Sequence, residues 1–350
     1  MKNKSALLLV TLILIFSVLA ATATLSAKEI EIKFAHEEPG DAATSSIHAA
    51  ALVFKNIVET QSNGEMVVNI YPASSMGQQR ERMELTQANV LQINIASIGG
   101  IAQFYPEISA IDLPFAFSNV AVADTVFDGV FGDKLKKNIL EETGLRFLGV
   151  SGGSFYVLSN NVRPIKTPED MKGIKFRTMS VPSHIAMIRA LGGAATPVDW
   201  AELYTSLQTG VVDGQHNPIS IMAIGGLQEV QKYVTLTNHL YGVDWWFTSQ
   251  DFYEELTEEQ RRIFINGYTN AIKVGRGTKM MLEATKFGVN FLEASGIKVY
   301  SPSSEELNQF KELTIPPVLD TLEEELGQEG VDLANELLDA VKKAEDLLYN

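Results

Sequence analysis

The chain has 350 residues, of which 28 are Lys or Arg and 43 are Asp or Glu, so its formal net charge is −15. Nucleic acid and anionic lipid surfaces are poor partners for so acidic a protein, because both repel it. The sequence contains no cysteine, which excludes disulfides, thiolate metal sites and a lipid-anchored cysteine.

The first 27 residues have the layout of a secretory signal peptide. Lys2 and Lys4 give a short basic start, 6–21 is largely apolar, and small residues follow. Because the apolar run is short for a membrane span, we expect cleavage after Ala23 or Ala27. Export of this kind places the mature chain in the periplasm, and an uncleaved N-terminal anchor is the alternative.

The next 125 or so residues alternate between short apolar strands and amphipathic helices. The expected strands are 30–34, 67–71, 93–96 and 147–150, and the expected helices are 44–59, 80–88 and 120–143. This alternation indicates an α/β lobe built on a largely parallel sheet.

A second set of elements begins near Phe155. The expected strands are 155–159 and 174–178, and the expected helices are 182–191, 200–209 and one that starts at Pro218. Asp199 and Glu202 fit a capping box, and Asn217 fits the N-cap of the helix after it.

Thr257 and Gln260 form another capping-box pattern, and helical periodicity then continues almost unbroken to Ser295. A helix of that length would measure about 55 Å, enough to span two lobes and tie them together. Charged helices are expected at 304–326 and 329–349. Since no flexible linker is present, we expect strands to cross between the lobes and form a hinge.

No motif of catalysis stands out in this sequence. A nucleophile elbow, a P-loop and a Rossmann glycine pattern are all missing. The five histidines have no close metal-ligand spacing, although spacing alone does not exclude a cluster in space. We therefore expect no cofactor, no metal site and no enzymatic activity.

The strand at 174–178 carries a candidate anion-binding group. Ile174 and Phe176 point to one face and Lys175 and Arg177 to the other. Arg177 lies near the C-terminal end of the strand, where open α/β sheets bind ligands, and its planar guanidinium matches a carboxylate. From the chemistry alone, a solvated side chain is the simpler interpretation of Arg177. Trp200, at the start of a helix, could lie over a ligand, but packing in the core is the simpler interpretation from spacing alone.

Several segments resemble one known family. They are 170–177, 203–215, Asn217-Pro218, 237–239 and 112–115. Together they are similar to the DctP-like solute-binding proteins of tripartite ATP-independent periplasmic (TRAP) transporters, and the similarity covers essentially the whole mature chain.

The resemblance implies an α/β, two-lobed, periplasmic-binding-protein-like (type II) fold, with a hinge, a ligand cleft that closes on binding, and a long lobe-spanning helix. We assign 1–27 to the signal peptide, 28–153 plus about 243–282 to lobe 1, and 154–242 plus about 283–350 to lobe 2 and the C-terminal helices.

The resemblance also implies site residues. Arg177 would pair with the ligand carboxylate, Asn217 would hydrogen-bond the same group, and Trp200 would pack on the ligand. Contacts expected from other positions are those of Glu37, Gln79, Ser97 and Asp244, the last facing the distal end of the ligand.

The chain departs from the family pattern at two positions. Tyr156 stands where many members have a second arginine, and His216 stands where a glutamate is common. Because the cleft would hold fewer fixed cations than in those members, and because Asp244 adds an acid, the sequence favours a simple dicarboxylate ligand less strongly. A monocarboxylate with a hydroxylated, amino or aromatic distal part, or a phosphate ester, stays open.

By this resemblance the chain binds a small organic anion and delivers it to the membrane permease subunits of a TRAP transporter. Three alternatives remain: a ligand sensor for a membrane receptor kinase, a secreted enzyme acting on an organic acid, and a binder that needs a bridging metal. We expect a monomer, although the helical tail 329–349 could pair with a second copy.

Overall fold

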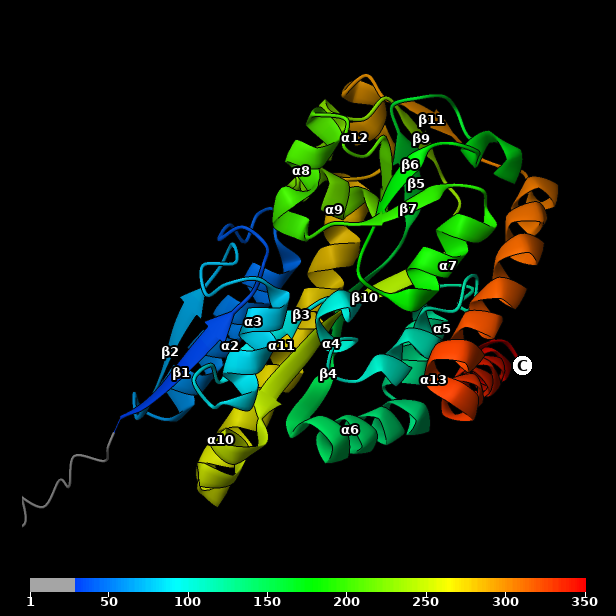
Figure 1. The fold of residues 1–350 in the computed structure, drawn as a ribbon. Helices are drawn as coiled ribbons and strands as arrows, with labels where there is room; N and C mark the ends of the chain where they lie inside the picture. Colours follow the sequence, from blue (N-terminus) through cyan, green and yellow to red (C-terminus); the bar gives the residue numbers. More distant parts are fainter. Residues whose placement is uncertain (1–28) are drawn as a thin grey trace, which may run out of the picture.

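A computed structural model describes residues 29–350, so the expected signal peptide lies outside the described range. Within this range the chain forms two α/β lobes, one around a five-stranded sheet and the other around a six-stranded sheet (Figure 1). No helix among residues 29–350 is both long enough and apolar enough to cross a membrane.

The sheet of lobe 1 has the strand order β2-β1-β3-β10-β4. Its strands are β1 (Ile30–Ala35), β2 (Met66–Tyr71), β3 (Ile93–Ala96), β4 (Leu145–Phe155) and β10 (Tyr241–Ser249). The helices around it are α2 (Ser46–Gln61), α3 (Gln79–Gln87), α4 (Ile98–Ile101), η1 (Pro106–Asp112), α5 (Val120–Phe127), α6 (Val130–Thr143) and α10 (Gln250–Glu255). β1 is parallel to β2 and β3, whereas β10 is antiparallel to β3 and β4. The expected largely parallel sheet is therefore mixed, because β10 returns from lobe 2 in the opposite direction.

The sheet of lobe 2 has the strand order β11-β9-β5-β8-β6-β7. Its strands are β5 (Val157–Asn160), β6 (Lys175–Thr178), β7 (Ala194–Pro197), β8 (Gly214–Asn217), β9 (Tyr233–Thr235) and β11 (Lys298–Tyr300). Its helices are η2 (Pro168–Met171), α7 (Pro182–Ala190), α8 (Trp200–Gln208), α9 (Ile219–Ile224), η3 (Leu227–Glu229) and α12 (Val289–Ala294). β6 is parallel to β7 and β8, so the C-terminal ends of these strands meet at one edge of the sheet.

Strands and helices connect the two lobes. Only Tyr156 separates β4 of lobe 1 from β5 of lobe 2, and its backbone N–H donates to the Leu240 carbonyl (2.9 Å) just before β10. α11 (Glu258–Thr285) packs on α2 and β4 and also reaches α9, while α13 (Ser304–Tyr349) packs on η1, α5 and α7 (Figure 1). Two adjacent crossing strands with helices packed on both lobes are the architecture of a hinge.

The apolar core continues across this junction. The largest buried cluster includes Phe147 and Trp245 of lobe 1 together with Leu158 and Phe176 of lobe 2. A second cluster lies between the lobe 1 sheet and helices α2 and α11, and a third lies within lobe 2. Side chains of both lobes therefore share one close-packed interior at the junction.

Two expected helices are interrupted. The helix expected at 120–143 breaks between α5 and α6, where Gly132 packs directly on the Phe127 carbonyl and leaves no room for a Cβ. The long helix ends at Thr285, so its 28 residues measure about 42 Å and α12 follows as a separate helix. Its capping box is confirmed, with Gln260 N–H donating to Thr257 Oγ1 (3.3 Å) and Thr257 N–H donating to Gln260 Oε1 (2.9 Å).

Candidate ligand-binding site

A cavity lies between the two lobes, a place where small-molecule sites are common. All eight residues that the sequence pointed to line it: Glu37, Gln79, Ser97, Tyr156, Arg177, Trp200, Asn217 and Asp244. Glu38, Met179 and Lys279 also line it and were not anticipated. The cavity thus brings together side chains from α3, β6, α8, β8, β10 and α11 and from the segments that follow β1 and β3. These elements are far apart in the sequence.

Strand register explains why three of these residues meet. Arg177 in β6 is in register with Gln215 in parallel β8, and Asn217 in β8 is opposite Val157 in antiparallel β5. Tyr156, just before β5, therefore lies at the same sheet edge as the C-terminal ends of β6 and β8. This edge is where ligands bind in open α/β sheets.

The Arg177 guanidinium is the central charge of this edge. The residue is 3% exposed, and among residues 29–350 its side chain makes one hydrogen bond, from Nε to the Val198 carbonyl (2.8 Å). Burial lowers the pKa of Arg177 to about 10, so the group stays charged at neutral pH. The two terminal nitrogens are free to donate side by side to an anion in the cavity.

Asn217 is not the helix cap that its position suggested. It is the last residue of β8, and α9 begins after Pro218 without a side-chain cap. The Asn217 amide instead donates to Gln215 Oε1 (2.5 Å), and Gln215 donates in turn to Ser159 Oγ (2.7 Å). These buried bonds fix the orientation of the amide beside Arg177.

Trp200 begins α8 and is half-buried at the rim of the cavity. A Cβ at Gly225 would lie 2.7 Å from ring carbon Cη2, so the glycine lets the ring pack closely on the end of α9. The expected capping box at Asp199 is wrong, because the Asp199 side chain makes no cap hydrogen bond. Asp199 lines a neighbouring cavity together with Trp200 and Arg177.

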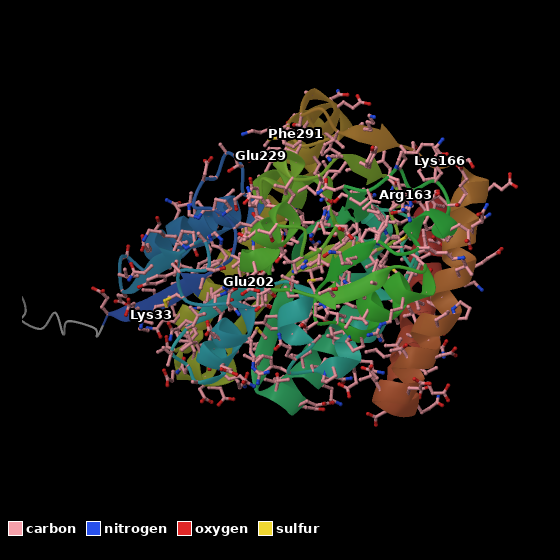
Figure 2. The ribbon with its side chains drawn as sticks, turned by 45° about the horizontal axis from the view of Figure 1, so that its top comes forward. Lys33, Arg163, Lys166, Glu202, Glu229 and Phe291 are labelled. Carbon is pink, nitrogen blue, oxygen red and sulfur yellow. The ribbon has the colours of Figure 1, made fainter. Side chains whose placement is uncertain are left out.

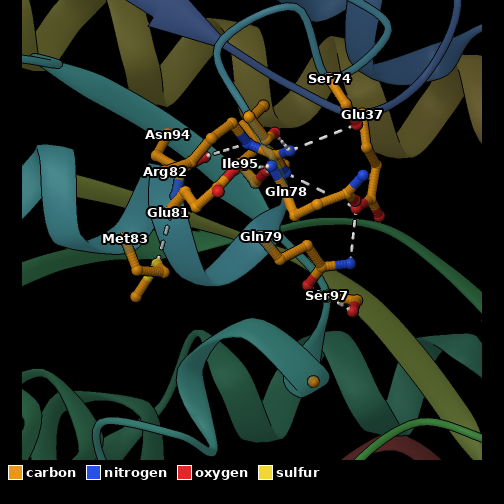
Figure 3. Close-up of polar contacts among 12 residues, drawn as sticks. Glu37, Ser74, Gln78, Gln79, Glu81, Arg82, Met83, Asn94, Ile95 and Ser97 are labelled. Carbon is orange, nitrogen blue, oxygen red and sulfur yellow. Dashed lines mark hydrogen bonds and ion pairs between the residues drawn. The ribbon is translucent and has the colours of Figure 1, made fainter. Parts of the chain in front are cut away.

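A buried arginine that was not among the expected site residues supports the wall of the cavity formed by lobe 1. Arg82 is fully buried, and its Nη2 lies 3.5 Å from Glu37 Oε2 (Figure 3). It also donates to Asn94 Oδ1 (3.0 Å). Gln79 donates to Glu37 Oε2 (2.5 Å) and accepts from Ser97 Oγ (2.9 Å). The network holds the Glu37, Gln79 and Ser97 side chains in place around the cavity.

Burial raises the pKa of Glu37, and the charge of Arg82 opposes that shift. The helical periodicity of the sequence does indicate that Arg82 is buried. It lies on the buried face of α3 together with Met83 and Thr86, a position where a charged residue requires a partner.

Lys279 is the second cation of the cavity and was also missed. The buried face of α11 repeats every four residues at Gly267, Ala271 and Gly275, and Lys279 is the next member. The expectation of few fixed cations in the cleft is corrected by Lys279, which lines the cavity together with Arg177. Surface cations lie elsewhere: Figure 2 shows Lys33 on lobe 1 and Lys166 on the outside of lobe 2.

Three of the five histidines meet behind Tyr156. His184 Nε2 lies 2.6 Å from Asp112 Oδ2, and His216 Nδ1 lies 3.2 Å from His239 Nε2. Burial lowers the pKa of His216 well below its usual range and that of His239 to about 3, so both are neutral at pH 7. Within residues 29–350, no group of three or more His, Asp or Glu is arranged to hold a metal ion.

Comparison with known proteins identifies clear relatives. A family model described as bacterial extracellular solute-binding protein, family 7 (DctP) matches residues 34–325. The 2,3-diketo-L-gulonate-binding periplasmic protein YiaO of Escherichia coli is 28% identical over 83% of this chain and 87% of its own length. The ectoine-binding periplasmic protein TeaA of Halomonas elongata is 31% identical over 87% of this chain and 88% of its own.

The fold is also similar to that of solved solute-binding proteins. The sugar acid binding protein DctPAm of Advenella mimigardefordensis, in complex with galactonate, matches with a TM-score of 0.83 and 30% identity, over 91% of this chain and 99% of that one. The named ligands of these relatives differ in chemistry, so the similarity alone does not assign one to this chain.

Proposed function

The chain belongs to bacterial extracellular solute-binding protein family 7, whose members include TRAP solute-binding proteins, and we propose that it captures a small carboxylate in the periplasm and delivers it to a TRAP membrane permease. The observation that carries the proposal is the buried Arg177 guanidinium, whose terminal nitrogens have no protein partner among residues 29–350.

A buried cation without a counter-charge is costly, and a ligand carboxylate would remove that cost. The planar guanidinium offers two parallel N–H donors to such a group, and Asn217 beside it can supply a further hydrogen bond. Pairing inside a closed, low-dielectric cleft is stronger than at a wet surface. Since salt screens charges beyond about 10 Å, the acidic outer surface opposes this local attraction only weakly.

Closure of the lobes supports capture and delivery. Ser97 Oγ of lobe 1 lies 3.4 Å from Met179 Sδ of lobe 2, so the two walls touch across the cavity. We propose that Tyr156 and Leu240 act as the hinge between β4–β5 and β9–β10, that the ligand holds the closed form together, and that the permease recognises that form. Cleavage of residues 1–27 on export belongs to the same proposal.

Isothermal titration calorimetry on the mature chain, with a panel of carboxylates and phosphate esters, tests the binding step. We expect Arg177→Met to weaken binding of any carboxylate ligand at least about 100-fold, because the buried anion loses its partner. Arg189→Met, an exposed arginine in the same lobe, should leave affinity unchanged. An Arg177→Met protein that binds with undiminished affinity would refute the proposed anchor.

Delivery has its own test. Proteoliposomes that contain the TRAP permease subunits from the same source should take up the ligand under an ion gradient only when this protein is supplied outside. Uptake at equal rate without it would contradict the proposed role in transport.

A further inference from the structure

One carboxylate oxygen joins residues of both lobes close to the crossing strands. Glu283 lies near the C-terminal end of α11, and its Oε1 accepts a hydrogen bond from Ser154 Oγ of β4 in lobe 1. The same oxygen accepts from Ser220 Oγ of α9 in lobe 2 (2.7 Å). Both serines are buried, so a hydroxyl that lost this acceptor there would be costly.

The end of α11 is held to lobe 1. The helix packs mainly on α2 and β4, both of which belong to that lobe. Lys286, the residue that follows α11, donates from Nζ to the Ala43 carbonyl between β1 and α2 (3.1 Å). Of the two bonds to Glu283, the one from Ser220 is therefore the bond that crosses between the lobes.

Glu283 is separated from the ligand cavity by the crossing strand. Tyr156 lines the ligand cavity, whereas its neighbours Phe155 and Val157 line a second cavity together with Glu283. Since neighbouring side chains of an extended chain point in opposite directions, the two cavities lie on opposite faces of this strand. Glu283 can therefore influence a bound molecule only through the relative position of the lobes.

Ser220 is coupled to the ligand cavity through its own segment. It follows Asn217 by three residues, and the next residue, Ile221, lines the ligand cavity with Asn217. A rotation of lobe 2 that opens the cleft carries Ser220 along with Asn217 and changes its position relative to α11. Because a hydrogen bond tolerates only small changes in distance and angle, that rotation breaks the bond to Glu283.

We infer that Glu283 is a positioning residue for ligand capture, and that its bond from Ser220 is a latch that stabilises the closed form. Ser154 orients the carboxylate from within lobe 1. Since the closed form binds the ligand more tightly, a latch that raises its population raises the apparent affinity. This inference rests on the proposed capture of a carboxylate by closure of the lobes.

Calorimetric titration of variants tests the latch, and the probe is the carboxylate of the panel above that binds the wild-type protein most tightly. We expect Glu283→Met to weaken its binding about 10-fold, because the closed form loses a hydrogen bond to a charged acceptor. Glu283→Gln keeps an acceptor oxygen in place and should weaken binding less. The loss should appear in the dissociation rate measured by stopped flow, since the bond forms only on closure.

Glu259→Met is the matched control, because Glu259 is an exposed glutamate in the first turn of the same helix. It should change neither affinity nor dissociation rate. Ser220→Ala should weaken binding about as much as Glu283→Met, and the double variant should bind no more weakly than either single variant, because both changes remove the same bond. Ser154→Ala should have a smaller effect, since its bond lies within lobe 1.

The outcomes separate the latch from the proposed function. Undiminished affinity in both Glu283→Met and Ser220→Ala would overturn the latch and leave capture at Arg177 intact. Additive losses in the double variant would overturn it too, because the two side chains would then act separately. If Glu283→Met does not fold, the affinity of Ser220→Ala decides. Binding of no carboxylate at all, or binding indifferent to Arg177→Met, would instead refute the proposed function.

Discussion

The Arg82 guanidinium lies 3.5 Å from the Glu37 carboxylate, fully buried behind the cavity wall that Glu37 helps to form (Figure 3). Breaking a buried pair on one side leaves an uncompensated charge. We expect Arg82→Met to lower the free energy of unfolding at pH 7 by about 3–5 kcal/mol, as measured by urea denaturation.

The double variant Arg82→Met/Glu37→Gln is the informative control for that pair. It should recover part of the lost stability, because the remaining amide needs no counter-charge. Arg80→Met, on the same helix but with an exposed partner in Glu84, should change stability little. Additive losses in the double variant would show that the pair is not coupled.

The buried histidines predict a pH dependence of stability. Burial depresses the folded pKa of His216 and His239, so below about pH 6.5 the unfolded chain binds protons that the folded protein does not. The contribution of each histidine to the free energy of unfolding is therefore complete above the pKa of the unfolded chain. It falls with falling pH, by up to about 1.4 kcal/mol per pH unit. His36 and His48, whose pKa values are also lowered, add to this slope.

Glu37 and Asp244, with raised pKa values, act in the opposite direction, since their folded forms bind protons more readily at low pH. Because both carboxyl groups are present in wild type and in His239→Phe, comparing these two proteins isolates the contribution of His239. The free energy of unfolding is measured by urea denaturation at pH 6.5, 6.0, 5.5 and 5.0. We expect the variant to lose less stability across this range. Identical slopes would mean that His239 does not stay neutral in the folded protein.

Contact between the lobes predicts a steric effect on closure. A Cβ at Gly99 of α4 would lie 3.1 Å from Met179 Sδ in lobe 2. We expect Gly99→Val to hold the lobes apart, to weaken ligand binding about 10-fold or more by analogy with overpacked cores, and to reduce ligand-induced compaction in small-angle X-ray scattering.

Gly277→Val is the matched control for closure, because a Cβ there has nothing within 4 Å. It should leave affinity and compaction as in wild type. If Gly99→Val behaves in the same way, the contact between Gly99 and Met179 does not belong to the ligand-bound form.

Asn217 predicts a charge effect on affinity. Asn217→Asp would place a carboxylate beside Arg177, where it would compete with the ligand anion for the guanidinium and repel it. We expect affinity to fall at least about 100-fold, with the melting temperature of the ligand-free protein unchanged or higher. Calorimetry and thermal melts measure the two quantities, and unchanged affinity would exclude contact between Asn217 and the carboxylate.

Much of this architecture was predictable from local patterns. Alternating apolar residues located β1 and β2, and the capping box at Thr257 located the start of α11. The segment around Arg177 and Asn217 indicated the family, which the family model confirms over residues 34–325. Such features depend on residues adjacent in the chain, so sequence alone carries them.

Local patterns failed where a partner distant in the chain decides the conformation. Asn217 follows every rule for a helix cap, yet pairing of β8 with β5 makes it the end of a strand. The helix expected at 120–143 has suitable periodicity, yet the close approach of Gly132 to the Phe127 carbonyl turns the chain. The division into lobes at 153/154 and about 243 and 283 stays a prediction.

The sequence by itself determined the α/β class, the family and an arginine at the C-terminal end of a strand. Tertiary structure alone decided what surrounds that arginine: Arg82 behind Glu37, Lys279 in the same cavity as Asp244, and three histidines behind Tyr156. Periodicity specifies which face of a helix or strand is buried, but not which residues it meets. Those partners depend on strand order and helix packing between segments that can lie more than a hundred residues apart.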